Sequence, residues 1–518
     1  MLKKSFISGA LILMLSGLVV RVMGFVYRIY LSNLIGAEGM GLFQLIFPLY
    51  SLVILTLTSG ISISVSRMVA EEMAKNHHAN TRRIMICGLK LIVGVSIFVS
   101  LLCFAFVDFI TTSILKDWRT YYSLILLIPC IPIIAAASAL KGYFYGIQEM
   151  MPTAISQIVE QIVRITLVML TAGWFLNVGL EYACAIATFG TALGEIANLL
   201  VLFIMYRLKK SIYFDDKQNR GLLNNVKIYK GLFFSALPIS FNRFVSSVMG
   251  AIETLLIPVR LVVGGMSHQL SLEAFGTMTG MAMPLIFFPT AVTSALATAL
   301  VPSISESVAK NNYKAARYKI SKSIQITLVQ GIIFTVIFSC YSNQICNVIY
   351  RKGKVGAVLY LLSFTCTFIY LQQILNGILN GLGMQAVSLW NSLIGGILRI
   401  GFVYFYIPLY GIQGYVWCII ISAVLVCILN IYAIVNKISL EIDIKNWIVK
   451  PGIVGLLMAV CSRYIYSFFS IFLTNDIWTI SFTLLANVVI AVELMSIVGV
   501  IEKGELTKLL GIKKLSNM

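Results

Sequence analysis

Hydrophobic runs of about 20 residues or more follow one another along the whole chain, separated by short polar turns. A helix needs about 20 mostly apolar residues to cross the hydrocarbon core of a bilayer. The pattern therefore predicts an all-α polytopic membrane protein with about fourteen transmembrane helices. The predicted spans lie near residues 8–30, 42–65, 85–107, 121–145, 153–174, 182–206, 232–257, 276–301, 320–342, 358–381, 387–410, 413–435, 447–469 and 477–500.

One stretch of the chain occurs twice. Residues 142–165 align with residues 377–400, without a gap, at a constant offset of 235 residues. Matches of Leu or Ile are expected by chance in so apolar a chain, but two glycines and an arginine in one register indicate an internal duplication. The coincident pairs are Gly142 with Gly377, Gly146 with Gly381, and Arg164 with Arg399.

The duplication divides the chain into two halves of six helices. The longest polar loop, near residues 207–231, lies between the sixth and seventh predicted spans, where the halves join. Because six is even, both halves enter the bilayer from the same face, as in a parallel repeat about an axis along the membrane normal. We therefore predict an N-terminal lobe at 1–206, a basic cytoplasmic linker at 207–231, a C-terminal lobe at 232–436, and two extra helices with a cytoplasmic tail at 437–518.

Composition agrees with this class and fixes an orientation. Of the 518 residues, 59% are hydrophobic and 11% are charged, whereas a soluble domain carries about a quarter charged residues. The net charge of +19 fits basic cytoplasmic loops better than a nucleic-acid partner, which we do not expect. With the N-terminus inside, 26 loop Lys and Arg residues lie inside and 6 outside. This asymmetry predicts a multi-pass cell-membrane protein with both termini cytoplasmic.

The sequence contains neither a recognisable metal site nor a catalytic motif. The ten cysteines are scattered without a CxxC pair and the three histidines have no ligand spacing, so we expect no metal and no cofactor. The predicted outside loops are short, and their acids, such as Glu38 and Asp117, stand alone. The chain also lacks the GxxxxGK(S/T) loop of ATP-driven proteins. We therefore expect a transporter rather than an enzyme, with no catalytic residues.

Several charged residues fall inside predicted spans, where each costs about 2.5–3.5 kcal/mol at a helix centre unless it meets a partner or water. So many charges indicate a hydrated interior shared by the bundle. Lys90, Arg463 and Glu493 lie near span ends or in the last helices, so we expect them to snorkel or to pair locally. The other such residues are Arg21, Arg28, Arg164, Arg243, Arg399, Glu160, Glu195 and Glu253.

Arginine outnumbers carboxylate among these charges. Glu160 and Arg164 are four residues apart on one helix face, so they either neutralise each other or act in transport. Arginine binds phosphate with a planar fork and stays charged when desolvated, so a surplus suits a phosphate or pyrophosphate group. A cavity for cationic drugs or sodium requires surplus carboxylate instead.

Four segments resemble a known superfamily. They are RVMGFVYRIYLSNLIGAEGMGLFQLIFPLY at 21–50, GISISVSRMVAEE at 60–72, KGYFYGIQEMMPTAISQIVEQIVRI at 141–165 and PISFNRFVSSVMGAIETLLIP at 238–258. Together they are similar to the MurJ-like and polysaccharide-transporter branches of the multidrug/oligosaccharidyl-lipid/polysaccharide exporter superfamily, and in particular to the stage V sporulation protein B family. The resemblance implies two six-helix lobes around a central cavity. It also implies flipping of lipid-linked peptidoglycan or oligosaccharide precursors in spore-cortex or cell-wall synthesis.

The resemblance also assigns roles to residues. Arg21 and Arg28 match, with one residue of spacing added, the two first-helix arginines of lipid II flippases, whereas Ile54 and Leu55 replace the arginine pair of their second helix. We predict a pyrophosphate-binding cavity formed by Arg21, Arg28, Arg243, Arg399 and Asn242. The predicted coupling or structural charges are Glu160, Arg164, Glu195 and Glu253. Whether one of these acids carries Na⁺ or H⁺, or only braces an arginine, stays open.

Three functions compete. A flippase that works by alternating access fits the arginine surplus, and its substrate is a lipid-linked anionic glycan taken from membrane lipid. We expect a monomer, with cell-wall synthesis enzymes as candidate partners. The alternative is a cation-coupled multidrug exporter of the MATE type, which predicts a carboxylate-dominated cavity and twelve helices. A membrane-embedded glycosyltransferase or polymerase would need a catalytic outside loop.

Overall fold

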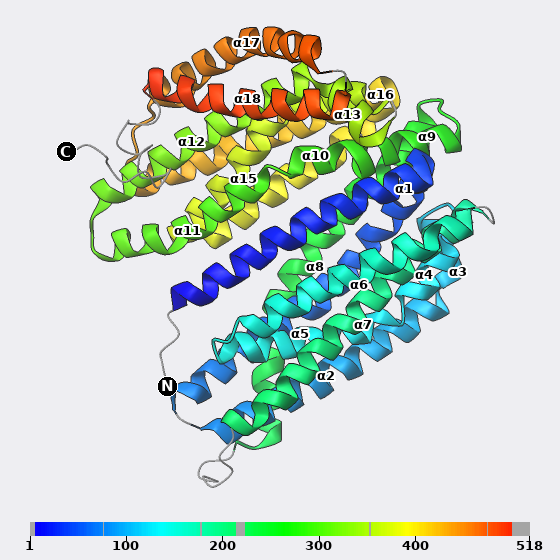
Figure 1. Ribbon diagram of the computed structural model, residues 1–518. Coiled ribbons are helices and arrows are strands. Elements are labelled where there is room, and N and C mark those ends of the chain that lie inside the picture. Colours follow the sequence, from blue (N-terminus) through cyan, green and yellow to red (C-terminus); the bar gives the residue numbers. More distant parts are fainter. Residues whose placement is uncertain are drawn as a thin grey trace. The chain divides into compact units, whose positions relative to one another are not determined.

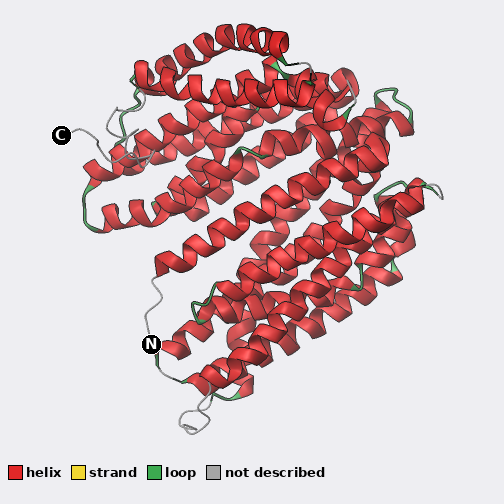
Figure 2. Cartoon of the chain, viewed as in Figure 1, coloured by secondary structure: helices red, strands yellow, loops and turns green. Residues whose placement is uncertain are grey.

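The computed structural model describes residues 6–75, 77–176, 179–213, 223–351, 354–473 and 475–499. The described residues form helices joined by short turns, with no strand among them (Figure 2). They belong to two compact units. Unit 1 comprises Met1–Val259 with Met266–Gly276, and unit 2 comprises Arg260–Gly265 with Thr277–Met518.

Figure 1 labels the helices in chain order. Unit 1 contains α1 (Phe6–Ala74), α2 (His78–Ala105), α3 (Val107–Phe109), η1 (Ile110–Ile114), η2 (Trp118–Thr120), α4 (Tyr121–Leu127), α5 (Cys130–Gly146), α6 (Met151–Leu176), α7 (Leu180–Tyr213), most of α8 (Asn225–Val263) and α9 (His268–Phe275). Unit 2 contains α10 (Met283–Phe287), α11 (Thr290–Ala309), α12 (Tyr313–Cys340), α13 (Ser342–Tyr350), α14 (Lys354–Ser363), α15 (Cys366–Gly381), α16 (Gln385–Ile438), η4 (Lys445–Val449), α17 (Lys450–Phe472) and α18 (Asp476–Ile497). The short segment η3 (Gly276–Ala282) lies at the boundary between the units.

All fourteen predicted spans fall on described helices, so the prediction of an all-α polytopic membrane protein is confirmed. Eleven described helices are long and apolar enough to cross a membrane, or thirteen when each bent pair counts as one span. Helices α1 and α16 each cover two predicted spans. Within each helix the two spans meet at a bend, where Gly36 or Gly411 has a positive φ. The predicted span 276–301 is divided among η3, α10 and α11, with a break before Pro289, which cannot donate a backbone hydrogen bond.

The 235-residue register of the duplication appears in the backbone of both units. Helices α2 and α12 are each 28 residues long and begin and end at equivalent positions. Helices α5 and α15 end at Gly146 and Gly381, and Gln148 and Gly383 then take the same left-handed conformation. The three backbone hydrogen bonds that close these two turns also correspond one for one. The prediction of an internal repeat is therefore confirmed.

The repeated glycines lie at equivalent close helix contacts. A Cβ atom at Gly142 would lie 2.5 Å from the carbonyl oxygen of Ser62, and one at Gly377 would lie 2.8 Å from Cβ of Ala297. Ser62 and Ala297 are themselves 235 residues apart. The absence of a side chain lets α5 approach α1 in unit 1, and α15 approach α11 in unit 2. This approach explains why these glycines recur.

The two C-terminal helices, α17 and α18, pack within unit 2. Helix α17 lies against α12 and α18, and Trp447 in η4 donates a hydrogen bond from Nε1 to Ser321 Oγ at 3.0 Å. The two compact units are defined by contacts between residues, whereas the lobes predicted at 1–206 and 232–436 are defined by the sequence repeat. Those boundaries therefore stay predictions. Within the predicted linker 207–231, residues 214–222 lie outside the described residues, as does the tail from residue 500.

Candidate functional site

A cluster of charged and amide side chains lies between α6 and α7 in unit 1. Arg164 Nη2 donates a hydrogen bond to Glu160 Oε1 at 2.7 Å, and the two side chains are 17% and 12% exposed. The pairing expected from their spacing is therefore present. Asn198 Nδ2 donates to Glu160 Oε2 at 3.0 Å and to Glu195 Oε2 at 3.2 Å. One amide group thus bridges two carboxylates, a link that sequence spacing did not reveal because it joins two helices.

Glycines allow the close approach of these helices. A Cβ atom at Gly190 would lie 2.4 Å from Cγ2 of Val168, and one at Gly194 would lie 2.9 Å from the carbonyl oxygen of Glu160. Because α7 has no side chain at these positions, Glu195 and Asn198 reach the polar face of α6. A larger residue at position 194 would move α7 away from α6 and separate Glu160 from the Asn198 amide group.

The cluster carries two carboxylates and one guanidinium, so its formal charge is negative when all three are ionised. Arg164 Nε and Asn198 Oδ1 are buried and have no hydrogen-bond partner among the described residues. The hydroxyl of Tyr50, which packs against Cys130, Ile134 and Ala192, is buried in the same way. The cluster therefore keeps one unpartnered donor, Arg164 Nε, and two unpartnered oxygens, Asn198 Oδ1 and the Tyr50 hydroxyl. In the described part of the chain, no group of three or more His, Cys, Asp or Glu is placed to hold a metal ion.

Helix α1, which carries the predicted Arg21 and Arg28, packs on α6. Arg21 is exposed and Arg28 is half-buried, two turns farther along the helix. The buried Tyr27 lies within reach of the charges of both Arg28 and Arg164. Tyr30 also joins α1 to α6, because its hydroxyl donates to the carbonyl of Met169 at 3.4 Å. The structure therefore packs α1 against α6 through Tyr30 and places Tyr27 near both Arg28 and Arg164.

The predicted residues of α8 lie in unit 1 as well. Asn242 and Arg243 are exposed, and Glu253 is half-buried. Ten residues separate Arg243 from Glu253, a rise of about 15 Å along a helix, so they do not form an ion pair. Helix α8 packs on α1 at Gly60, whose missing side chain leaves space for Ser240 and Ala236.

Arg399 lies in α16 of unit 2, at the repeat position of Arg164, so its relation to the arginines of unit 1 stays a prediction. The position equivalent to Glu160 is Gly395, where a Cβ atom would lie 2.3 Å from Cγ2 of Val426. The position equivalent to Glu195 is Asn430, whose Oδ1 accepts from Asn391 Nδ2 at 2.8 Å. Asn430 Nδ2 in turn donates to Asn376 Oδ1 at 3.1 Å. Unit 2 thus has neutral residues, Gly395 and Asn430, at the positions of the two acids Glu160 and Glu195, and it keeps the arginine.

A second charged group lies at the predicted outside end of unit 1, and it corrects one expectation. Glu38 and Asp117 were expected to stand alone, but both accept hydrogen bonds from the Arg119 guanidinium, each at 2.8 Å. Gln269 Nε2 also donates to Glu38 Oε2 at 3.0 Å. These acids are fully engaged in holding α9 and the α3–α4 connection against α1.

Comparison with known proteins shows similarity along most of the chain. Residues 6–308 match the family described as "Polysaccharide biosynthesis protein". Stage V sporulation protein B of Bacillus subtilis (strain 168) is 31% identical over 472 residues, which cover 90% of this chain and 91% of that protein. Lipid II flippase MurJ of the same strain is 27% identical over 422 residues, 77% of each chain. The solved structure titled "Lipid II flippase MurJ, inward closed conformation" matches with a TM-score of 0.69 at 14% identity, and covers 93% of this chain and 97% of that one.

Proposed function

Because the chain belongs to the polysaccharide biosynthesis protein family, we propose that it moves a lipid-linked anionic glycan precursor of the lipid II class across the cell membrane by alternating access. The precursor serves spore-cortex or cell-wall synthesis, and both chain termini are cytoplasmic. We further propose that the protein acts as a monomer, performs no covalent chemistry, and passes its cargo to cell-wall synthesis enzymes.

The observation that carries the proposal is the separation of charges within unit 1. Its acids Glu160 and Glu195 are held by Arg164 and Asn198 on α6 and α7, whereas Arg21 and Arg243 are exposed on α1 and α8. Guanidinium groups bind phosphate oxygens in a bidentate manner and keep their charge at low dielectric. Arg21, Arg28 and Arg243, with Asn242, therefore suit a pyrophosphate linkage.

The α6–α7 cluster supports a coupling role. Its acid excess is balanced by one proton or one sodium ion, and we propose that Glu160 and Glu195 exchange this cation during transport. Proteoliposomes with an imposed proton or sodium gradient test this role. Substitution Glu195→Gln should abolish the dependence of transport on the gradient and leave gradient-independent exchange intact. An unchanged dependence would assign the cluster a purely structural role.

The main experiment is a leaflet-accessibility assay for lipid II in cells depleted of this protein. Depletion should trap lipid II in the inner leaflet, and re-expression of the wild-type chain should restore its outer exposure. The acid excess of the α6–α7 cluster also favours a second candidate, a cation-coupled multidrug exporter of the MATE type. That function predicts efflux of cationic dyes that needs Glu195 and not Arg243, together with unchanged lipid II exposure on depletion.

A further inference from the structure

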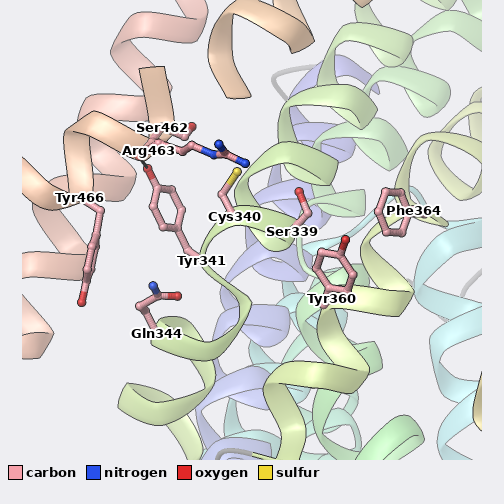
Figure 3. A pocket seen from close by; sticks show the side chains of 9 residues that line it. All are labelled: Ser339, Cys340, Tyr341, Gln344, Tyr360, Phe364, Ser462, Arg463 and Tyr466. Atoms are coloured by element: carbon pink, nitrogen blue, oxygen red, sulfur yellow. Dashed lines mark hydrogen bonds between the residues drawn. The ribbon is translucent and has the colours of Figure 1, made fainter. Parts of the chain in front are cut away.

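A pocket in unit 2 lies apart from the residues discussed so far. It has a volume of about 480 Å³ and lies where α12, α13 and α14 meet α17 (Figure 3). Its polar lining includes Ser339, Tyr341, Gln344, Tyr360 and Arg463. One cation and no acid line this pocket, so its electrostatic potential favours an anion.

Arg463 is the residue that most needs an explanation. It lies in α17, a largely apolar helix, and its side chain is exposed. No carboxylate of the described residues forms an ion pair with it. Figure 3 shows its guanidinium directed toward Cys340 and Ser339, with Tyr360 on the far wall. An arginine without an ion-pair partner costs free energy even toward the end of an apolar span, where Arg463 lies. A bound anion or water would relieve that cost.

The wall beside Arg463 is rigid. The hydroxyl of Tyr341 donates to the carbonyl of Ser462 and accepts from Asn487 Nδ2 at 3.0 Å, while Ser462 Oγ donates to Asn487 Oδ1 at 2.7 Å. All three residues are buried. This network fixes α17 and α18 against the α12–α13 turn. The backbone of Arg463, the residue after Ser462, is therefore held in place beside the pocket.

The level of the pocket indicates the source of the anion. Cys340 lies near the end of the predicted span 320–342, and Tyr360 lies near the start of the predicted span 358–381. The pocket is therefore placed where helices leave the hydrocarbon, the level of lipid headgroups and of tyrosine side chains. Phe364 supplies an apolar wall beside the polar groups.

We propose that this pocket binds the phosphate of an anionic membrane phospholipid, with Arg463 as the bidentate phosphate ligand. The Tyr360 hydroxyl and the Gln344 amide supply further donors, and the acyl chains remain in the bilayer. The bound lipid joins α14 to α17 and thereby fastens the C-terminal helix pair to unit 2. This proposal is independent of the transported substrate.

Thermal unfolding of the purified full-length protein in detergent tests the proposal. A ligand that binds only the folded state raises its stability as its concentration exceeds the dissociation constant. Phosphatidylglycerol should raise the midpoint by several degrees, whereas phosphatidylcholine and inorganic phosphate at the same concentration should not. Arg463→Ala should abolish the increase, and Tyr360→Phe should reduce it. The control Lys90→Ala, which removes an exposed in-span charge from α2, should keep the full increase.

Thiol labelling locates the site. Cys340 lines the pocket, and the other partly exposed cysteines, Cys103 and Cys461, can be replaced by serine. Phosphatidylglycerol should slow Cys340 labelling at least threefold in this background, and Arg463→Ala should remove the protection. An equal stabilisation of Arg463→Ala, or equal protection by phosphatidylcholine, would overturn the proposal. Protection by inorganic phosphate alone would overturn the assignment to a lipid.

Discussion

Gln148 and Gly383 occupy equivalent positions of the repeat and share a left-handed backbone conformation, with φ of 60° and 76°. Each follows the helix that ends at a repeated glycine. An L-residue with a Cβ atom is strained in this region by about 1–2 kcal/mol, and glycine is not. Unit 1 therefore carries a local strain that unit 2 has removed.

A reciprocal exchange at these turns tests the strain. Gln148→Gly should raise the free energy of unfolding by about 1 kcal/mol or less, and Gly383→Gln should lower it by about 1 kcal/mol, because only the glycine fits the left-handed region freely. Thermal unfolding of the two variants in detergent measures the shifts. Shifts of the same sign for both exchanges would contradict the equivalence of the turns.

The close contacts at Gly142 and Gly377 predict different effects of a second, compensating substitution in the facing helix. Gly142→Ala and Gly377→Ala should each destabilise by about 1–3 kcal/mol, because both overpack a helix contact. Ala297→Gly should relieve Gly377→Ala, since the obstructing atom is a side-chain Cβ. Ser62→Gly should not relieve Gly142→Ala, since the obstructing atom is a backbone oxygen. A double-mutant cycle should give a coupling of about 1 kcal/mol for the first pair and near zero for the second.

The two hydrogen bonds of Asn198 allow the stabilities of two variants, Asn198→Ala and Asn198→Asp, to be ranked. Asn198→Ala removes the donor shared by Glu160 and Glu195, and the loss of a buried hydrogen bond to a charged group costs about 1.5–3 kcal/mol. Asn198→Asp should cost more, because it places a third carboxylate beside the other two. Thermal midpoints of the two variants check this order. If Asn198→Asp lowered the thermal midpoint less than Asn198→Ala, the pair Glu160 and Glu195 would have to be protonated in the folded protein.

Charge reversal tests the proposed phosphate site. Arg243→Glu should lower the outer-leaflet exposure of lipid II more than tenfold, because it replaces attraction to a phosphate with repulsion, while protein levels in the membrane stay normal. Lys90→Glu reverses a charge on α2 and should leave exposure unchanged. Full transport by Arg243→Glu would show that Arg243 does not contribute to the binding site.

The hydrogen bonds of Asp443 predict that the local stability of η4, the segment before α17, depends on pH. Its pKa lies below its usual value because the backbone N–H and the side chain of Asn446 donate to its carboxylate. A lowered folded pKa stabilises the protein above the unfolded pKa, and this contribution is lost as pH falls through the folded pKa. Amide exchange in η4, corrected for its intrinsic pH dependence, should therefore show less protection at acidic pH. Asp443→Asn should show no such change.

Hydropathy and spacing were sufficient to predict much of this protein. The spans were visible because a helix that crosses a bilayer must be apolar over its length. The register of Gly142 and Gly377 was visible because close helix contacts exclude a side chain, and the Glu160–Arg164 pair because four residues make one turn.

Contacts between helices were not predictable in the same way. Asn198 bridges α6 and α7, and Arg119 binds acids that come from separate elements. No periodicity within one helix specifies which face of another helix it meets. The pocket beside Arg463 was missed for the same reason, since snorkelling accounts for a lone arginine when its neighbours are unknown.

The chain of Asn376, Asn391 and Asn430 has a consequence for the history of the protein. Amides neither gain nor lose protons at physiological pH, so Asn430 joins its neighbours through hydrogen bonds between neutral groups at the position where unit 1 has Glu195. The two copies have thereby diverged at this position, with an ionisable carboxylate in one copy and a neutral amide in the other.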